Sequence, residues 1–288
     1  MHRLLSIAVL LALLPFLTGA TLIVRGPVRS GAITYDTDAQ AFFDRVVTNG
    51  GTISTATKGY VNTFVLAAKA NGYWSDIQRI NLFCGDQLAA CLTPLKINGA
   101  ETSDNNVNFV SGDYTEATGL AGNGTSKRLY TDLTGNANGD ANGHLCAVVA
   151  TESGSTGVWL GANTTDLSGS NRNAIFGDSG TTLRYDYTGD TNNVSVTSDM
   201  LGIIVGSRVS GSDSRLFRNG SQVGSTQTSN GSGVTSRNFE VFSMGDALWF
   251  GGTLRGYSIG TGMTAAEVAS FTTDLEAFND SLGRGVIP

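Results

Sequence analysis

The stretch Leu216-Phe217-Arg218-Asn219-Gly220-Ser221-Gln222-Val223 has the form of a β-hairpin. An apolar and aromatic segment leads up to Asn219-Gly220, and a second segment returns after it. An Asn-Gly pair favours a tight two-residue turn, because both central residues of that turn need a positive φ. We therefore predict a type I′ turn at Asn219-Gly220 that joins two antiparallel strands.

Short apolar or alternating runs recur on both sides of this hairpin. Gly-Asn, Asn-Gly, Gly-Asp and Ser-Gly turns separate them, and the chain holds 38 Gly but only 4 Pro. Many short strands joined by such turns are typical of a β-sandwich or barrel. We predict strands at 106–110, 127–131, 144–151, 156–160, 173–177, 181–187, 193–197, 201–209, 214–218, 237–243 and 247–259.

Helical patterns flank this strand region at both ends. Thr264-Ala265-Ala266-Glu267 has the form of a capping box, which starts a helix that reaches about residue 282. Before the strands, Asp36-Thr37-Asp38 and Ser54-Thr55 can begin two helices, which Asn49-Gly50 and Asn71-Gly72 end. Pro94 ends a brief third helix. We predict these three helices at 39–47, at about 55–70 and at 86–92.

The first twenty residues have the layout of a secretory signal peptide. His2 and Arg3 are followed by an apolar run over residues 4–17 and by the small residues Thr18-Gly19-Ala20. The run is shorter than the roughly 20 residues that a membrane-spanning helix needs. We expect cleavage after Ala20 and a secreted product with no membrane segment. The expected organisation is a signal peptide (1–20), an N-terminal helical segment (21–95) and a jelly-roll domain with its C-terminal helix (96–288).

The composition argues against two classes of partner. Charged residues make up only 15% of the chain, the formal net charge is −6 and the sequence pI is about 4.9. A chain with this acidic balance lacks the broad positive surface that grips nucleic acid or anionic lipid. We therefore expect no nucleic-acid partner and no membrane partner.

The three cysteines do not form a disulfide framework, because their number is odd. Cys84 and Cys91 could pair only if a turn, for which Gly85-Asp86 is suited, brings them together. Cys146 lies in an apolar run and is expected to pack in the core.

Residues for the common hydrolytic mechanisms are scarce. Beyond His2, the sequence contains one histidine, His144, which we expect at a surface or strand edge rather than in a catalytic triad. No cysteines and histidines are spaced for zinc, and no Glu-x-Asp-x-x-Glu pattern supplies two carboxylates on one strand face. These observations predict a protein that is not an enzyme and has no required cofactor.

The sequence is compatible with one metal, calcium. Asp190 and Asn192 lie in an oxygen-rich turn and could supply ligands. The alternative is that these residues are present because Asp and Asn form turns readily.

The C-terminal third resembles the laminin-G/concanavalin A-like superfamily. The hairpin at 216–223 is similar to one in that group, and two further segments resemble its closing strand and helix: Phe250-Gly251-Gly252-Thr253-Leu254-Arg255-Gly256-Tyr257-Ser258-Ile259 and Met263-Thr264-Ala265-Ala266-Glu267-Val268. The resemblance implies a jelly-roll sandwich.

The chain from about residue 38 to residue 283 also resembles a group of tailed-phage virion-associated proteins, in which a short helical segment precedes a jelly roll. The similar pieces are Ala41-Phe42-Phe43-Asp44-Arg45, Tyr60-Val61-Asn62-Thr63-Phe64-Val65, Gly72-Tyr73-Trp74-Ser75 and Leu120-Ala121-Gly122-Asn123-Gly124-Thr125-Ser126. This resemblance implies a structural or receptor-contact role.

These observations together predict a mainly β, concanavalin A-like jelly-roll sandwich with a short N-terminal helical segment and a C-terminal helix. The expected function is a non-catalytic structural or interaction protein on a phage particle or cell exterior, with cell-surface glycan as its ligand and homo-oligomer or particle assembly as a further role. The alternative is a secreted glycan hydrolase or lyase of the same fold. Sugar rings pack on aromatic faces, so the candidate ligand-binding residues are Trp159, Trp249, Tyr185 and Tyr187. The two tryptophans have the alternative of lying on core faces of their strands.

Overall fold

The structure is a computed structural model. It describes residues 33–135, 137, 142–152, 154, 156–163, 172–178, 180–187, 194–228 and 236–288. Residues 35–288 form one compact unit, and residues 1–34 form a second, of which only residues 33 and 34 are described. The predicted signal peptide (1–20) and the candidate calcium ligands Asp190 and Asn192 lie outside the described residues. Within the described residues, no helix has the length and apolar character needed to cross a membrane.

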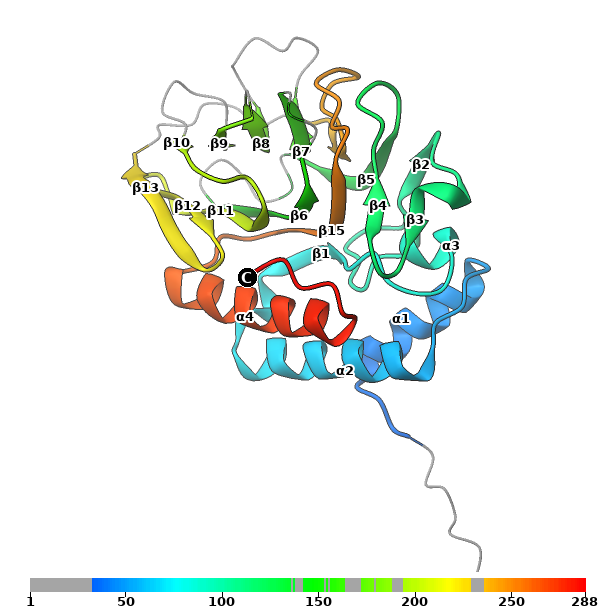
Figure 1. Cartoon of the computed structure of the whole chain (residues 1–288). Helices are drawn as coiled ribbons and strands as arrows, with labels where there is room; N and C mark the ends of the chain where they lie inside the picture. The colour runs from blue at the N-terminus through cyan, green and yellow to red at the C-terminus, as the bar shows by residue number, and fades with distance from the viewer. Residues whose placement is uncertain are drawn as a thin grey trace, which may run out of the picture. The chain divides into compact units, whose positions relative to one another are not determined.

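The unit is built around two antiparallel sheets (Figure 1). Sheet A runs in the order β13 (Ser221–Gln227), β12 (Asp213–Arg218), β11 (Gly202–Ser210), β6 (Gly143–Thr151), β15 (Thr253–Gly260), β4 (Gly119–Ala121) and β3 (Tyr114–Thr115), and β1 (Ile77–Asn81) also pairs with β15. Sheet B runs in the order β10 (Val194–Thr197), β9 (Thr182–Asp186), β8 (Asn173–Asp178), β7 (Gly157–Ala162), β14 (Asn238–Val241), β5 (Arg128–Thr134) and β2 (Asn105–Val107). The predicted mainly β sandwich fold is confirmed.

The three longest helices lie on one side of the strands, and a short fourth helix lies beside β3 (Figure 1). Three of them begin at the caps that the sequence predicts, because the side chains of Asp36, Ser54 and Thr264 accept hydrogen bonds from backbone N–H groups of the first turn. The described helices are α1 (Thr37–Thr48), α2 (Thr55–Ala70), α3 (Leu88–Cys91) and α4 (Ala265–Ser281), with short 3₁₀ turns η1 (Tyr73–Ser75) and η2 (Ser111–Asp113). Helices α2 and α4 pack against each other.

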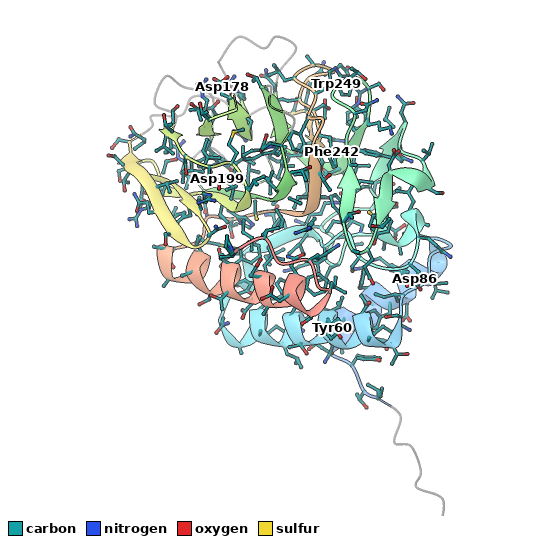
Figure 2. The ribbon with its side chains drawn as sticks, in the orientation of Figure 1. Tyr60, Asp86, Asp178, Asp199, Phe242 and Trp249 are labelled. Carbon is teal, nitrogen blue, oxygen red and sulfur yellow. The ribbon has the colours of Figure 1, made fainter. Side chains whose placement is uncertain are left out.

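The central strand β6 of sheet A is buried on both faces. Along β6, Leu145, Ala147 and Val149 point into the core between the sheets, whereas Cys146 and Val148 join the core formed with the helices. This explains why the β6 sequence is a continuous apolar run rather than an alternating one. Phe242 lies in the middle of the sandwich (Figure 2). Cys146 is therefore a core residue, as predicted, and Cys84 and Cys91 are buried free thiols as well.

The hairpin between β12 and β13 has the predicted turn. Asn219 and Gly220 have φ angles of 52° and 78°, and Arg218 pairs with Ser221 across the turn. The side-chain oxygen of Asn219 accepts a hydrogen bond from the backbone N–H of Ile203, at 2.9 Å. The turn is thereby fixed to the neighbouring strand β11.

Alanine substitutions at Gly220 and at Gly59 should change stability in opposite directions. A Cβ at Gly220 would meet no atom closer than 3.5 Å, so the cost of Gly220→Ala comes from its positive φ and should be about 1 kcal/mol. Gly59 lies inside α2 with free space around it, so Gly59→Ala should stabilise the protein by roughly 0.5–1 kcal/mol. Urea unfolding of both variants measures the two effects. Equal shifts for both variants would contradict a left-handed requirement at Gly220.

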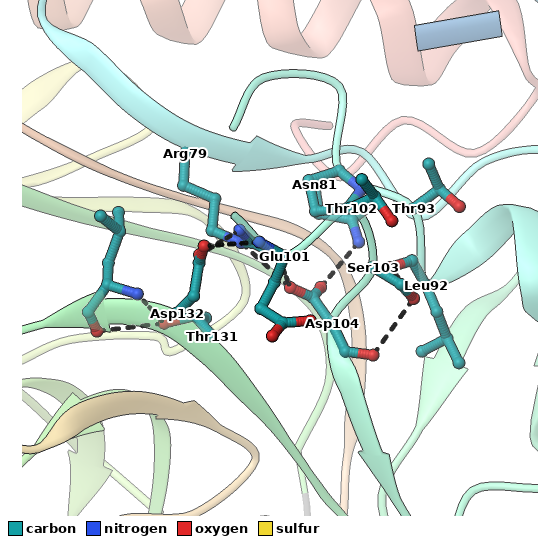
Figure 3. Close-up of polar contacts among 12 residues, drawn as sticks. Arg79, Asn81, Leu92, Thr93, Glu101, Thr102, Ser103, Asp104, Thr131 and Asp132 are labelled. Atoms are coloured by element: carbon teal, nitrogen blue, oxygen red, sulfur yellow. Dashed lines mark hydrogen bonds and ion pairs between the residues drawn. The ribbon is translucent and has the colours of Figure 1, made fainter. Parts of the chain in front are cut away.

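A buried polar network ties β1 to the loop that precedes β2 (Figure 3). Arg79 is fully buried, and its guanidinium donates to Asp104 Oδ1 at 2.8 and 3.1 Å and to Asp132 Oδ1 at 2.5 Å. Tyr257 also donates to Asp104 Oδ1, and Asn81 donates to Asp104 Oδ2. Burial alone would lower the pKa of Arg79, but Tyr257 and Asp104 outweigh burial and raise it. The network thus holds a permanent charge inside the unit.

Candidate functional site

Three of the four predicted ligand-binding aromatics lie in the core between the sheets. Trp159 is completely buried, and Tyr185 and Tyr187 are 1% and 6% exposed. The hydroxyl of Tyr185 donates to the carbonyl of Gly143, and that of Tyr187 donates to the carbonyl of Asn142. These three side chains therefore present almost no surface to a ligand, and only Trp249 is partly exposed.

The prediction that His144 lies at a surface or strand edge is wrong. His144 is completely buried on β6, the central strand between β11 and β15. Its Nδ1–H donates to the carbonyl of Thr261 at 2.6 Å, so its Nε2 accepts from the hydroxyl of Ser258 at 2.9 Å. Burial lowers the pKa of His144 to about 4, although the bond to Thr261 acts in the opposite direction. The histidine is a neutral structural residue, closed to substrate.

The outer face of sheet B carries a different set of side chains. Leu129, Leu183 and Val241 point into the core between the sheets, so the residues that alternate with them point outward. These outward residues are Arg128 and Tyr130 on β5, Glu240 on β14, Arg184 and Asp186 on β9, and Ala174, Phe176 and Asp178 on β8. The face is therefore rich in arginine, carboxylate and aromatic side chains.

A tight turn between β14 and β15 lies over this face. Gly245 and Asp246 both have a positive φ, at 64° and 58°, and Met244 pairs with Ala247 across them. This is the geometry of a type I′ turn. Met244 packs in a small apolar cluster on the outside of sheet B, and the carbonyl of Leu248 accepts from Val158 N–H at 2.9 Å. The turn thus holds Asp246 and the nearby Trp249 against the sheet.

Four of these residues form a group that we name the Trp249 cluster: Arg128, Tyr130, Asp246 and Trp249. The guanidinium carbon of Arg128 lies 4.7 Å from the ring centroid of Tyr130 and 5.0 Å from that of Trp249, so the cation contacts both rings. Arg128 also forms an ion pair with Asp246, whose Oδ1 accepts from the Tyr130 hydroxyl at 3.0 Å. Burial, the bond to Asp246 and the charge of Glu240 raise the pKa of Tyr130 to about 12. Tyr130 is therefore a neutral hydrogen-bond donor.

A second group, the Phe176 cluster, lies on the same face. Its members are Phe176, Arg172, Arg184, Asp178 and Asp186. The guanidinium carbons of Arg172 and Arg184 lie 5.3 and 5.2 Å from the Phe176 ring centroid. Arg172 pairs with Asp186, and Arg184 pairs with Asp178 at 3.4 Å. Phe176 is only 3% exposed, so this cluster presents guanidinium groups rather than a bare ring.

The two clusters differ in what they can bind. The Trp249 cluster offers a partly exposed indole, a phenol donor and a carboxylate acceptor at one place. An aromatic plane beside a few oriented polar groups is suited to a ligand with one apolar face and several hydroxyls. The sequence predicts Trp249 as a candidate ligand contact, but that prediction does not include Arg128, Tyr130 or Asp246. The alternation around Leu129 would have placed Arg128 and Tyr130 on one face.

Two grooves also occur on the side of the helices. One of about 110 Å³ lies between α2 and α4, and one of about 140 Å³ lies beside the start of α4. Among their lining residues each has one carboxylate, Asp274 in the first and Asp213 in the second. Neither groove has the carboxylate pair that the hydrolase alternative requires. In the described part of the chain, no cluster of three or more His, Cys, Asp or Glu side chains could hold a metal ion.

Comparisons by sequence match no family profile and no curated protein. Comparisons by structure find carbohydrate-binding and sialidase structures. The CBM40 of the Ruminococcus gnavus IT-sialidase, bound to α2,6 sialyllactose, has a TM-score of 0.38 and 10% identity over 46% of this chain and 83% of its own. The Trypanosoma rangeli sialidase with the inhibitor DANA has a TM-score of 0.45 and 12% identity over 75% of this chain and 38% of its own. The K499G mutant of NanB sialidase from Streptococcus pneumoniae has a TM-score of 0.42 and 10% identity over 53% of this chain and 27% of its own.

The prediction that the chain is not an enzyme is wrong as an exclusion, because sialidases are among the similar structures and one of them matches 75% of this chain. The scarcity of His and Glu excludes particular catalytic patterns, but it does not exclude catalysis as such.

Proposed function

We propose that this chain binds carbohydrate on the outer face of sheet B, with the Trp249 cluster as the contact surface. The observation that carries the proposal is the partly exposed indole of Trp249, held by Arg128 beside the paired Tyr130 and Asp246. Sugar C–H faces pack on an aromatic plane, and sugar hydroxyls both donate and accept hydrogen bonds. The cluster supplies each of these contacts.

The type I′ turn supports the proposal by fixing the cluster before a ligand arrives. Glu240 accepts hydrogen bonds from the Ser243 hydroxyl at 2.5 Å and from the Gly245 N–H at 3.2 Å. These bonds hold the turn against strand β14. A preorganised surface loses less conformational entropy on binding than a mobile one. The cluster is therefore a rigid platform for a ligand.

Trp249→Ala should lower the affinity for any glycan that the protein binds by at least about tenfold, because a central aromatic contact commonly contributes ~1.4 kcal/mol or more. Trp249→Phe should keep most of the affinity, since it retains an aromatic plane. The measurement is a glycan array followed by calorimetry on the glycans retained.

The matched control is Tyr60→Ala. Tyr60 is another partly exposed aromatic, and it lies on α2 at the opposite side of the unit from Trp249 (Figure 2). This variant should bind glycan as the original chain does. Equal affinity in the original chain and Trp249→Ala, or equal losses in Trp249→Ala and Tyr60→Ala, would overturn the proposed site.

The same glycans should be assayed for cleavage, because the site also contains two carboxylates, Glu240 and Asp246. Both raise the pKa of the Tyr130 hydroxyl. Turnover that Glu240→Gln abolishes while binding persists would assign the site to the alternative class, a glycan hydrolase or lyase.

We also propose that this binding takes place on a cell exterior or a phage particle, where the chain contributes to a homo-oligomer or particle. The support is the layout of residues 1–20, which is that of a signal peptide, and the resemblance of residues 38–283 to tailed-phage virion-associated proteins. Mass spectrometry of culture medium and of purified particles tests this location. Recovery from the cell interior alone would contradict it.

A further inference from the structure

We propose that the outer face of sheet B selects uncharged glycans and disfavours those that carry carboxylate or sulfate groups. This inference rests on the proposed function and names the ligand class of that same site. It follows from how the three arginines of this face are already engaged.

Each arginine already has a carboxylate partner within the protein. Arg128 pairs with Asp246 through Nη1, Arg172 pairs with Asp186 through Nη2, and Arg184 pairs with Asp178 through Nη1. A guanidinium that is neutralised in this way attracts a ligand anion far less than a free one does.

The three guanidinium groups have also lost one of the two paired arrangements that arginine uses for anions. Strong recognition of a carboxylate or sulfate commonly uses two parallel N–H groups of one guanidinium. In Arg128, Arg172 and Arg184 the Nε is buried and has no hydrogen-bond partner. A ligand therefore cannot pair with Nε and a terminal nitrogen of the same guanidinium in any of the three residues.

The balance of charge points in the same direction. Glu240 adds a carboxylate whose hydrogen bonds come from the uncharged groups Ser243 and Gly245. The charged residues named on this face thus include one more carboxylate than guanidinium groups. Like charges disfavour binding, so the excess negative charge, to which the buried Glu240 and Asp186 contribute from beneath the surface, disfavours an anionic sugar.

The contacts that remain suit neutral sugars. Trp249 offers an aromatic plane, the phenol of Tyr130 is uncharged, and Asp246 can accept hydrogen bonds from hydroxyls. Asp246 is also the residue whose charge can be removed with least disturbance. Asn adopts a positive φ more readily than most residues, so Asp246→Asn should keep the type I′ turn while it releases Arg128.

The test is an array of matched glycan pairs that differ only in charge, such as tetragalacturonate with its methyl ester and sulfated lactose with lactose. The original chain, Trp249→Ala and Asp246→Asn are compared on the same array. We expect Trp249-dependent binding of neutral members at least about tenfold tighter than that of their charged partners. We expect Asp246→Asn to narrow this gap by about threefold or more, because it removes a carboxylate and frees a cation.

The outcomes separate the two proposals. Trp249-dependent binding in which the charged members bind as tightly as the neutral ones, or more tightly, would overturn the selectivity and leave the proposed site standing. An unchanged gap in folded Asp246→Asn would also overturn the selectivity. The absence of Trp249-dependent binding to any glycan would overturn the proposed function and this inference together.

Discussion

Replacing Arg79 by methionine should lower the free energy of unfolding by about 3–5 kcal/mol, because it leaves a buried carboxylate without its cation. The side chains of Arg79 and Asp104 are both completely buried. After the substitution, the Asp104 carboxylate would keep the hydrogen bonds from Tyr257 and from Asn81. Urea unfolding followed by far-UV circular dichroism measures the loss.

A surface ion pair on another strand provides the control. Arg218 on β12 pairs with Asp199 at 2.6 Å, but the two side chains are 24% and 59% exposed. Arg218→Met should therefore cost less than about 1 kcal/mol. The double variant Arg79→Met with Asp104→Asn should recover part of the loss, because it also removes the unpaired charge of the buried Asp104 carboxylate. A loss for Arg79→Met no larger than that for Arg218→Met would contradict the role assigned to burial.

The protein should lose about 3 kcal/mol of stability through His144 as the pH falls from about 6.5 to about 4. Burial lowers the pKa of the folded-state histidine to about 4, whereas an unfolded histidine titrates near 6.5. Between these values the unfolded chain binds a proton that the folded chain does not, so a falling pH favours unfolding. Above pH 6.5 both states are neutral at His144, and the full stability is present.

His144→Gln isolates this contribution. The variant should be less stable than the original chain at pH 7.5, because it changes the bonds to Thr261 and Ser258. Its disadvantage should shrink by about 3 kcal/mol between pH 7.5 and pH 4, since glutamine does not titrate. Carboxylates contribute equally to both proteins and cancel in the difference. A difference in unfolding free energy that stays constant over this range would show that His144 does not titrate as its burial implies.

Much of the fold follows from local sequence. The Asn219-Gly220 turn and the caps at Asp36, Ser54 and Thr264 occur where the sequence predicts them. These features depend on the φ angles and hydrogen bonds of a few adjacent residues, so their signal lies within a short window. Short strands and Gly-rich turns are also local signals, and together they predicted the β-sandwich.

Strand neighbours and the exposure of aromatic side chains required the tertiary structure. Trp159 and Trp249 both lie in apolar surroundings in the sequence, yet one is fully buried and the other is partly exposed. A register shift in β7 between Val158 and Leu160 changes the alternation there, and such a shift has no clear mark in the sequence.

The sequence by itself determined the elements and the class of fold, because caps, turns and alternation are local. It also supplied Trp249 as a candidate ligand contact. The tertiary structure alone decided that Trp249 lies beside Arg128, Tyr130 and Asp246. Strand β5 pairs with β14, so that Tyr130 lies opposite Glu240, and the turn after β14 then brings Asp246 to the Tyr130 hydroxyl. More than a hundred residues separate Tyr130 from Asp246 along the chain. Only the pairing of strands that are distant in sequence joins them into one cluster.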